Sequence, residues 1–195
     1  MAQTIDDKTL DQMPVQDYDQ VRPQLKSGDL LFASGSYPAS KLIQKFTDSV
    51  WSHVGILFRV ESLDRVLLLE SVEDMGVRFA PLSKYLSDYE NGKPYRGRVL
   101  IARRQDLKAQ AIADLARTGI DELTRPYDRD EIAKIMVRIA LGKGKARRDR
   151  EYICSELVHE CFERAGYAFD YNPRGFVSPE DIWRHASVQA RFRLL

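Results

Sequence analysis

The sequence predicts an α+β domain in which a curled, mainly antiparallel β-sheet packs against helices. Runs of β-branched and other apolar residues dominate from Gly28 to Ala102, whereas apolar residues at helical spacing dominate from Leu107 onward. An order of strands followed by helices is typical of α+β domains rather than of doubly wound folds, in which strands and helices alternate.

The first part of the chain, residues 1–24, is expected to be a poorly ordered arm or a loosely docked helix. Its few apolar residues, Leu10, Met13 and Val15, barely define an apolar face. Residues 25–195 are predicted to form a single domain, since this length buries one full core. The arm lacks the apolar core of a secretory signal and no later run is long enough to span a bilayer, so a cytoplasmic location is expected.

The elements are predicted from hydrophobic periodicity and turn residues. Residues 61–64 separate the second and third strands and suit a hairpin loop. A last helix is expected to begin near Cys154 and to end at Gly166. The predicted strands are 30–33, 53–60, 65–70, 77–80 and 98–102. The other predicted helices lie at 40–46 and 132–139, and along the apolar stripe formed by Leu107, Ala111 and Leu115.

The charge balance restricts the partners. The 30 Lys and Arg residues nearly balance the 29 Asp and Glu residues, so no overall field attracts the chain to nucleic acid or to a membrane. The one strongly basic stretch, residues 142–150, is either a solvated linker or a local recruiter of an anionic substrate. The expected partner is a small substrate, and the oligomeric state is left open.

The two cysteines, Cys154 and Cys161, are seven residues apart in a segment with helical patterning. A helix places such a pair about 10 Å apart, which is too far for a disulfide. Cys154 falls where the N-terminus of this helix is expected, and the positive potential there favours a thiolate. The alternative is that Cys154 is a small core residue, which is the commoner role of a helical cysteine.

His53 and Glu70 are predicted to lie on one face of the sheet. If the hairpin loop between residues 60 and 65 holds an even number of residues, opposite positions sum to an odd number and these two side chains share a face. Glu70 would then orient the imidazole and leave its other nitrogen for a thiol. Gly55 leaves room on the same face. The alternatives are a capping histidine and a strand-end carboxylate in solvent.

No metal or organic cofactor is predicted. His159 and Cys161 together with Cys154 superficially suggest a metal site, but side chains at these helical offsets point around the helix and the chain has no Cys-x-x-Cys pair. A core role for Cys161 and a surface position for His159 are expected instead. His185 has no partner that the sequence reveals.

The residues resemble the permuted papain-like hydrolases, the YiiX/YebB-like branch of the NlpC-type superfamily, which also contains the lecithin-retinol acyltransferases. The resemblance runs from Leu25 to Trp183 and rests on the ordered set 28–32, 51–56, 69–77, 126–128 and 152–158. It implies a permuted papain-like fold with Cys154 as nucleophile, His53 as base and Glu70 as the group that orients the imidazole. Tyr127 and Asp128 resemble a Tyr-Asp pair of the family, which implies either a substrate-side role for Tyr127 or turn architecture.

The resulting hypothesis is a cysteine hydrolase that cleaves amide or peptide bonds through an acyl-enzyme on Cys154. Its substrate is expected to be a peptide, an amide or another acyl-bearing small molecule. Two alternatives remain: a lipid acyltransferase or phospholipase, and a catalytically silent binding module on the same fold.

Overall fold

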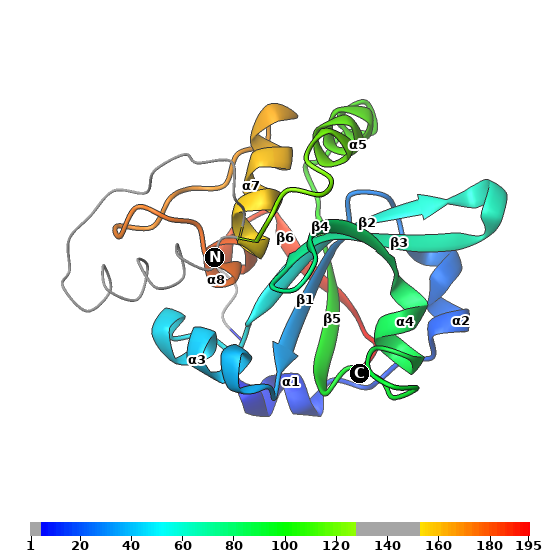
Figure 1. The fold of residues 1–195 in the computed structure, drawn as a ribbon, viewed down its shortest axis with the longest axis vertical. Helices are drawn as coiled ribbons and strands as arrows, with labels where there is room; N and C mark the ends of the chain where they lie inside the picture. The colour runs from blue at the N-terminus through cyan, green and yellow to red at the C-terminus, as the bar shows by residue number, and fades with distance from the viewer. Residues whose placement is uncertain (1–4, 128–152) are drawn as a thin grey trace.

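The computed structural model describes residues 5–127 and 153–195. The predicted helix at 132–139, the basic stretch 142–150 and Asp128 therefore lie outside the described residues. Figure 1 shows one twisted sheet with helices on both of its sides. The strands are β1 Leu30–Gly35, β2 His53–Val60, β3 Arg65–Val72, β4 Gly76–Pro81, β5 Gly97–Arg104 and β6 Val188–Arg193. The α-helices are α1 Asp7–Gln12, α2 Tyr18–Val21, α3 Pro38–Thr47, α4 Leu82–Ser87, α5 Ala111–Asp121, α7 Cys154–Arg164 and α8 Pro179–Arg184, and short 3-10 helices lie at Arg22–Gln24 and Glu61–Leu63.

The sheet is antiparallel and open, with six strands in the order β4-β3-β2-β1-β5-β6. The predicted curled, antiparallel sheet is confirmed, and the five predicted strands are β1 to β5. β4 and β6 are its two edges, so the sheet curls without closing into a barrel.

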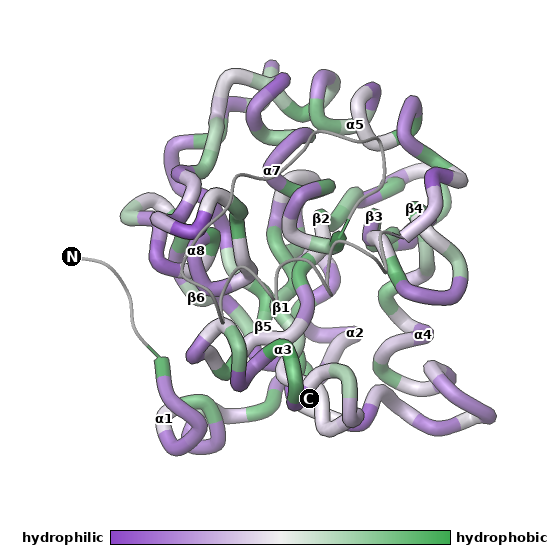
Figure 2. Tube along the Cα trace, turned by 60° about the vertical axis from the view of Figure 1, so that its left-hand side comes forward, coloured by the Kyte–Doolittle hydropathy of each residue, from purple (hydrophilic) through white to green (hydrophobic). Residues whose placement is uncertain are grey.

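Alternate side chains of each strand enter two different cores, as the period of two in a strand requires. In β1, Leu30 and Phe32 belong to one cluster, whereas Leu31 and Ala33 belong to the other. Helices α7 and α8 cover the first face, and α4 covers the second. Figure 2 shows hydrophobic segments in the central strands and hydrophilic segments in the outer turns.

The expectation of a last helix at Cys154 was wrong, because α8 and the strand β6 follow α7. β6 pairs with β5 and completes the sheet, so the chain does not run simply from strands to helices. Helix α8 begins with a capping box, in which Ser178 and Asp181 bond each other's backbone N–H. Six residues are too short for a helical stripe to be read from sequence.

The expected loose docking of the N-terminal arm was also wrong for residues 5–24. Leu10 is fully buried in the cluster under α7 and α8, and Val21 is buried on the other face. The Arg193 guanidinium in β6 donates hydrogen bonds of 2.6 and 3.0 Å to the carbonyl oxygens of Leu10 and Met13. The arm is held by a partner at the opposite end of the chain, which a local sequence pattern does not reveal.

Candidate active site

The hairpin β2–β3 positions His53 and Glu70. Its register pairs Ile56 with Leu69 and Leu57 with Leu68, so opposite positions sum to an odd number, as the sequence predicted for an even loop. Glu70 is fully buried, and His53 Nε2 lies 2.8 Å from Glu70 Oε2. The expectation that these two side chains share a face is confirmed, and the alternative of a solvent-facing carboxylate is excluded by the burial.

Gly55 makes this approach of the two strands possible. A Cβ atom built on Gly55 would lie 2.7 Å from the carbonyl oxygen of Leu69 and 3.4 Å from Cβ of Glu70. A side chain here would collide with the backbone of β3. The glycine therefore keeps open the space through which the carboxylate reaches the imidazole.

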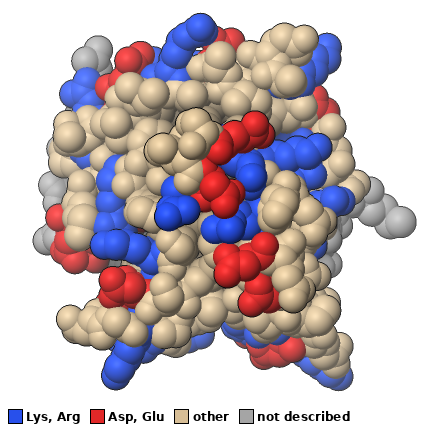
Figure 3. All heavy atoms as spheres, turned by 90° about the vertical axis from the view of Figure 1, so that its right-hand side faces the viewer, with Lys and Arg blue, Asp and Glu red and all other residues tan. Residues whose placement is uncertain are grey.

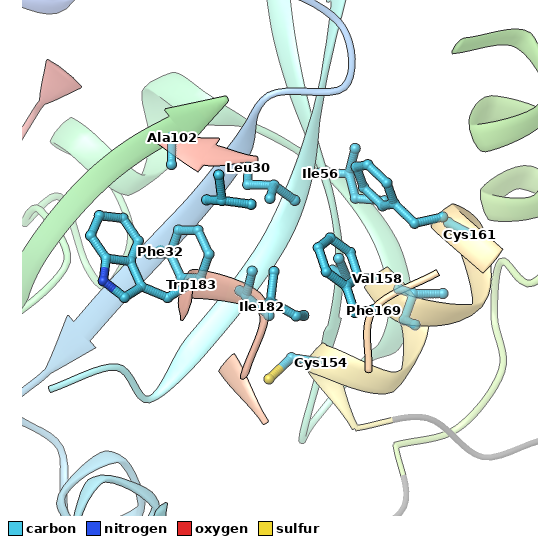
Figure 4. Packing of buried hydrophobic residues seen from close by; sticks show 14 of the residues in the cluster. Leu30, Phe32, Ile56, Ala102, Cys154, Val158, Cys161, Phe169, Ile182 and Trp183 are labelled. Carbon is cyan, nitrogen blue, oxygen red and sulfur yellow. The ribbon is translucent and has the colours of Figure 1, made fainter. Parts of the chain in front are cut away.

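Cys154 is the first residue of α7, as the sequence predicted. Helix α7 packs on β2 and β3, and its start lies where β2 begins, so the Cys154 thiol lies beside the His53 imidazole and interacts with it electrostatically. Because His53 Nε2 is engaged by Glu70, Nδ1 is the ring nitrogen left for the sulfur. Figure 4 places Cys154 at the margin of the apolar cluster, with its sulfur pointing away from Val158 and Phe169.

The electrostatics of the site favour a charged imidazolium. Burial alone would lower the pKa of His53, but the charge and hydrogen bond of Cys154, and then those of Glu70, outweigh burial and raise this pKa to about 10. Burial would likewise raise the pKa of Glu70, yet His53 and other neighbours lower it below its ordinary value. At neutral pH the ring is therefore positively charged between a carboxylate and a sulfur.

Two hollows meet at this point. One, of about 470 Å³, is lined by Cys154, Ser155 and almost wholly apolar surface from Ile43, Phe46 and Phe176. The other, of about 1210 Å³, is more polar and holds His53. Both volumes include some open solvent. The site therefore has an apolar side at the thiol and a polar side at the imidazole.

Tyr127 lines both hollows, together with Ile43. Its ring packs against Ile153 and Phe176, which places it beside the residue that precedes Cys154. The structure thus brings Tyr127 to the site that the sequence assigned to it. Asp128 lies beyond the described residues.

Three residues at the site were missed in the sequence. Arg78 and Tyr85 both bond Glu70, and Ser155 lines the apolar hollow. Arg78 lies directly opposite Glu70 in the register of β3 and β4. The predicted strand ends at residues 70 and 77 enclose an even loop, which would have placed Val77 opposite Glu70 instead, so the sequence did not indicate Arg78. Tyr85 reaches the site from α4 by packing, which no local pattern indicates.

Three residues that were not predicted to belong to the site lie elsewhere: His159, Cys161 and His185. Cys161 is a core residue as expected, but the expected surface position of His159 was wrong, since this side chain is buried under Tyr171. Helix α7 carries it on its inner face. His185 packs its ring on Phe169 and accepts a hydrogen bond from the Ser187 amide.

Comparison with known families decides the classification. Residues 24–172 match the family described as permuted papain-like amidase enzymes, YaeF/YiiX, C92 family. The chain belongs to this family. In the permuted order the histidine strand precedes the cysteine helix, as β2 precedes α7 here. A comparison with curated proteins finds no match.

A solved structure supports the fold of this permuted papain-like amidase. The crystal structure of yiiX from Escherichia coli O157:H7 matches with a TM-score of 0.64 and 21% identity, over 86% of this chain and 97% of that one. That protein is described as a metalloprotein. Within residues 5–127 and 153–195 of the present chain, no three His, Cys, Asp or Glu side chains are grouped to hold a metal ion.

Proposed function

We propose that the protein hydrolyses an amide bond with Cys154 as nucleophile, His53 as general acid and base, and Glu70 as the group that orients the imidazole. The observation that carries this proposal is the position of His53, which lies beside Cys154 on one side and is hydrogen bonded to the buried Glu70 on the other. A nucleophile, a base and a third group that orients the base are the arrangement that covalent catalysis needs. Membership of an amidase family supports the bond type.

The reaction begins with attack of the Cys154 sulfur on the substrate carbonyl carbon, and the π electrons of the C=O bond move onto oxygen. Backbone N–H groups in the first turn of a helix have no intrahelical acceptor, so those at the start of α7 are available to the oxyanion. His53 then gives its proton to the nitrogen as the C–N bond breaks. The neutral imidazole next takes a proton from water, whose oxygen attacks the thioester carbon. The intermediate then collapses to release the acid and the Cys154 thiolate, paired again with the imidazolium.

We infer which half of the substrate each hollow binds. The apolar hollow at Cys154 fits an apolar acyl group, and the polar hollow at His53 fits the leaving amine, which takes its proton from the imidazolium. Tyr127, which borders both, is proposed as a substrate-side residue. The substrate is then an amide with an apolar acyl part.

A Cys154→Ala variant tests the assignment. Turnover of a panel of fluorogenic amides, from acetyl to octanoyl, is expected to fall by at least about 1,000-fold, because no covalent intermediate forms. The control is Cys161→Ala in the same helix, since burial raises the pKa of Cys161 to about 12 and keeps it a thiol. Unchanged turnover in Cys154→Ala would reject the mechanism.

The apolar hollow favours a second candidate function, hydrolysis or transfer of a lipid acyl group. In that case Cys154 captures an acyl chain as a thioester from phosphatidylcholine vesicles, which intact-mass measurement detects. A third possibility, a silent binding module, predicts that iodoacetamide alkylates Cys154 no faster than an ordinary thiol. Rapid alkylation at pH 6 would exclude this third possibility.

A further inference from the structure

Glu70 is contacted by four donor atoms of the protein, as many as the lone-pair positions on a carboxylate. His53 Nε2 and the Tyr85 hydroxyl both donate to Oε2. Arg78 Nε donates to Oε1 at 2.9 Å, and a terminal nitrogen of the same guanidinium forms an ion pair with Oε1 at 2.8 Å. Both oxygens of the carboxylate are therefore hydrogen bonded although the side chain is fully buried.

Two separate elements deliver the additional donors. Arg78 in β4 is the direct cross-strand partner of Glu70 in β3, so the register of this hairpin sets the ion pair. Tyr85 comes from α4, which covers the same face and follows β4 after Pro81. Its ring is held by contacts with Tyr89 and Tyr95, at centroid distances of 4.8 and 5.5 Å.

A buried carboxylate without such partners is a poor fixed anion, because desolvation favours its neutral form. A neutral Glu70 carries no charge to stabilise the imidazolium, and its hydroxyl competes to donate where His53 Nε2 must donate. We propose that Arg78 and Tyr85 are positioning residues that hold Glu70 as an oriented anion, so that the imidazolium of His53 stays paired with Cys154 in weakly acidic solution. This inference rests on the proposed function, in which Cys154 reacts as a thiolate.

The charged groups around Glu70 agree with this role. Burial opposes ionisation of Glu70, but the hydrogen bond and charge of His53, followed by the charge of Arg78, lower its pKa. Burial, and then the charge of Glu70, raise the pKa of Tyr85 well above its ordinary value, so its hydroxyl remains a donor. Burial and Glu70 also raise the pKa of Tyr89, which is therefore neutral beside the pair.

The pH dependence follows from these directions. A carboxyl with a lowered pKa stays ionised until the solution is strongly acidic, and the support that it gives to His53 is lost as the pH falls through that pKa. Removing Arg78 raises the pKa of Glu70, since an arginine partner lowers a carboxyl pKa by about 1–3 pH units. The imidazolium, and with it the thiolate, then loses its support at a higher pH.

The experiment is the rate of alkylation of Cys154 by iodoacetamide between pH 4 and pH 9, read from the tryptic peptide by mass spectrometry. In Arg78→Gln we expect the midpoint of the acid limb to move upward by about one pH unit or more. Tyr85→Phe keeps every charge and should move it upward by less. Arg78→Lys retains the positive charge and should remain closer to the wild type than Arg78→Gln.

The control is Arg65→Gln on the same strand as Glu70, an exposed residue whose side chain bonds the carbonyl oxygens of Leu63 and Asp64. It changes the net charge equally and should leave the midpoint in place. A purely structural role for Arg78 would lower the rate at every pH without moving the midpoint, and an unmoved or lowered midpoint in Arg78→Gln overturns the inference. If wild-type Cys154 itself reacts like an ordinary thiol, the proposed function fails instead, so the two failures are distinguishable.

Discussion

The side chain of Ser155 lies at the site in an environment that destabilises the folded protein. Its hydroxyl is buried, and among the described residues it has no hydrogen-bond partner. A buried, unpaired hydroxyl destabilises a fold by about 1–3 kcal/mol. Ser155 directly follows Cys154 and lines the apolar hollow, so the unpaired hydroxyl lies where an acyl group is proposed to bind.

Replacing this hydroxyl is expected to stabilise the protein. In Ser155→Ala we expect the free energy of unfolding, measured by urea denaturation, to rise by about 1 kcal/mol, because the desolvated group is removed. The matched control is Ser178→Ala, which removes a hydroxyl that accepts from the Asp181 amide and caps α8, and should lower stability by about 1 kcal/mol. Equal losses in both variants would show that Ser155 is hydrogen bonded in solution.

At the scale of the elements, the site depends on the register of β2, β3 and β4. A change of one residue in either hairpin would turn Glu70 or its partners to the other face of the sheet. At Gly55 this arrangement leaves no room for a side chain, because a Cβ atom there would meet Leu68, the carbonyl oxygen of Leu69 and Glu70. Strands usually favour β-branched residues, but the close approach of β2 to β3 leaves no room for a side chain at residue 55.

A methyl group at residue 55 should therefore impair both stability and the site. For Gly55→Ala we expect a loss of about 1–3 kcal/mol in the free energy of unfolding and slower alkylation of Cys154, because β3 and Glu70 must shift. The comparison is Gly92→Ala, where a new Cβ meets nothing within 4 Å but the φ of +75° disfavours a side chain. This variant should lose some stability at unchanged Cys154 reactivity. Normal reactivity in Gly55→Ala would contradict the steric argument.

Segments near the two ends of the chain meet in the folded molecule. Arg193 binds carbonyl oxygens of the N-terminal segment, and Leu10 enters the core. Charged groups of both signs are interspersed on the face in Figure 3, which agrees with the balanced composition. Among the described helices, none has the length and apolar character that crossing a bilayer requires. The division at residue 24, the cytoplasmic location and the absence of a nucleic-acid partner remain predictions.

The docking of the N-terminal segment has a measurable consequence. Leu10→Ala is expected to lower the free energy of unfolding by about 2–5 kcal/mol, the usual cost of a cavity at a fully buried leucine. Val15→Ala is the control, because this side chain is 58% exposed and should change stability by less than about 0.5 kcal/mol. Similar stabilities of the two variants in urea would mean that the arm is detached in solution.

The sequence alone determined the features that depend on local periodicity. The start of α7 at Cys154, the five strands β1 to β5 and the shared face of His53 and Glu70 follow from helical spacing, from alternation along strands and from an even hairpin loop. The tertiary structure alone decided that α7 meets the start of β2, that β6 returns to the sheet, and that Leu10, His159 and Tyr85 are buried. These features depend on packing between segments far apart in the chain. A local pattern of side chains does not indicate which distant segment will pack against it.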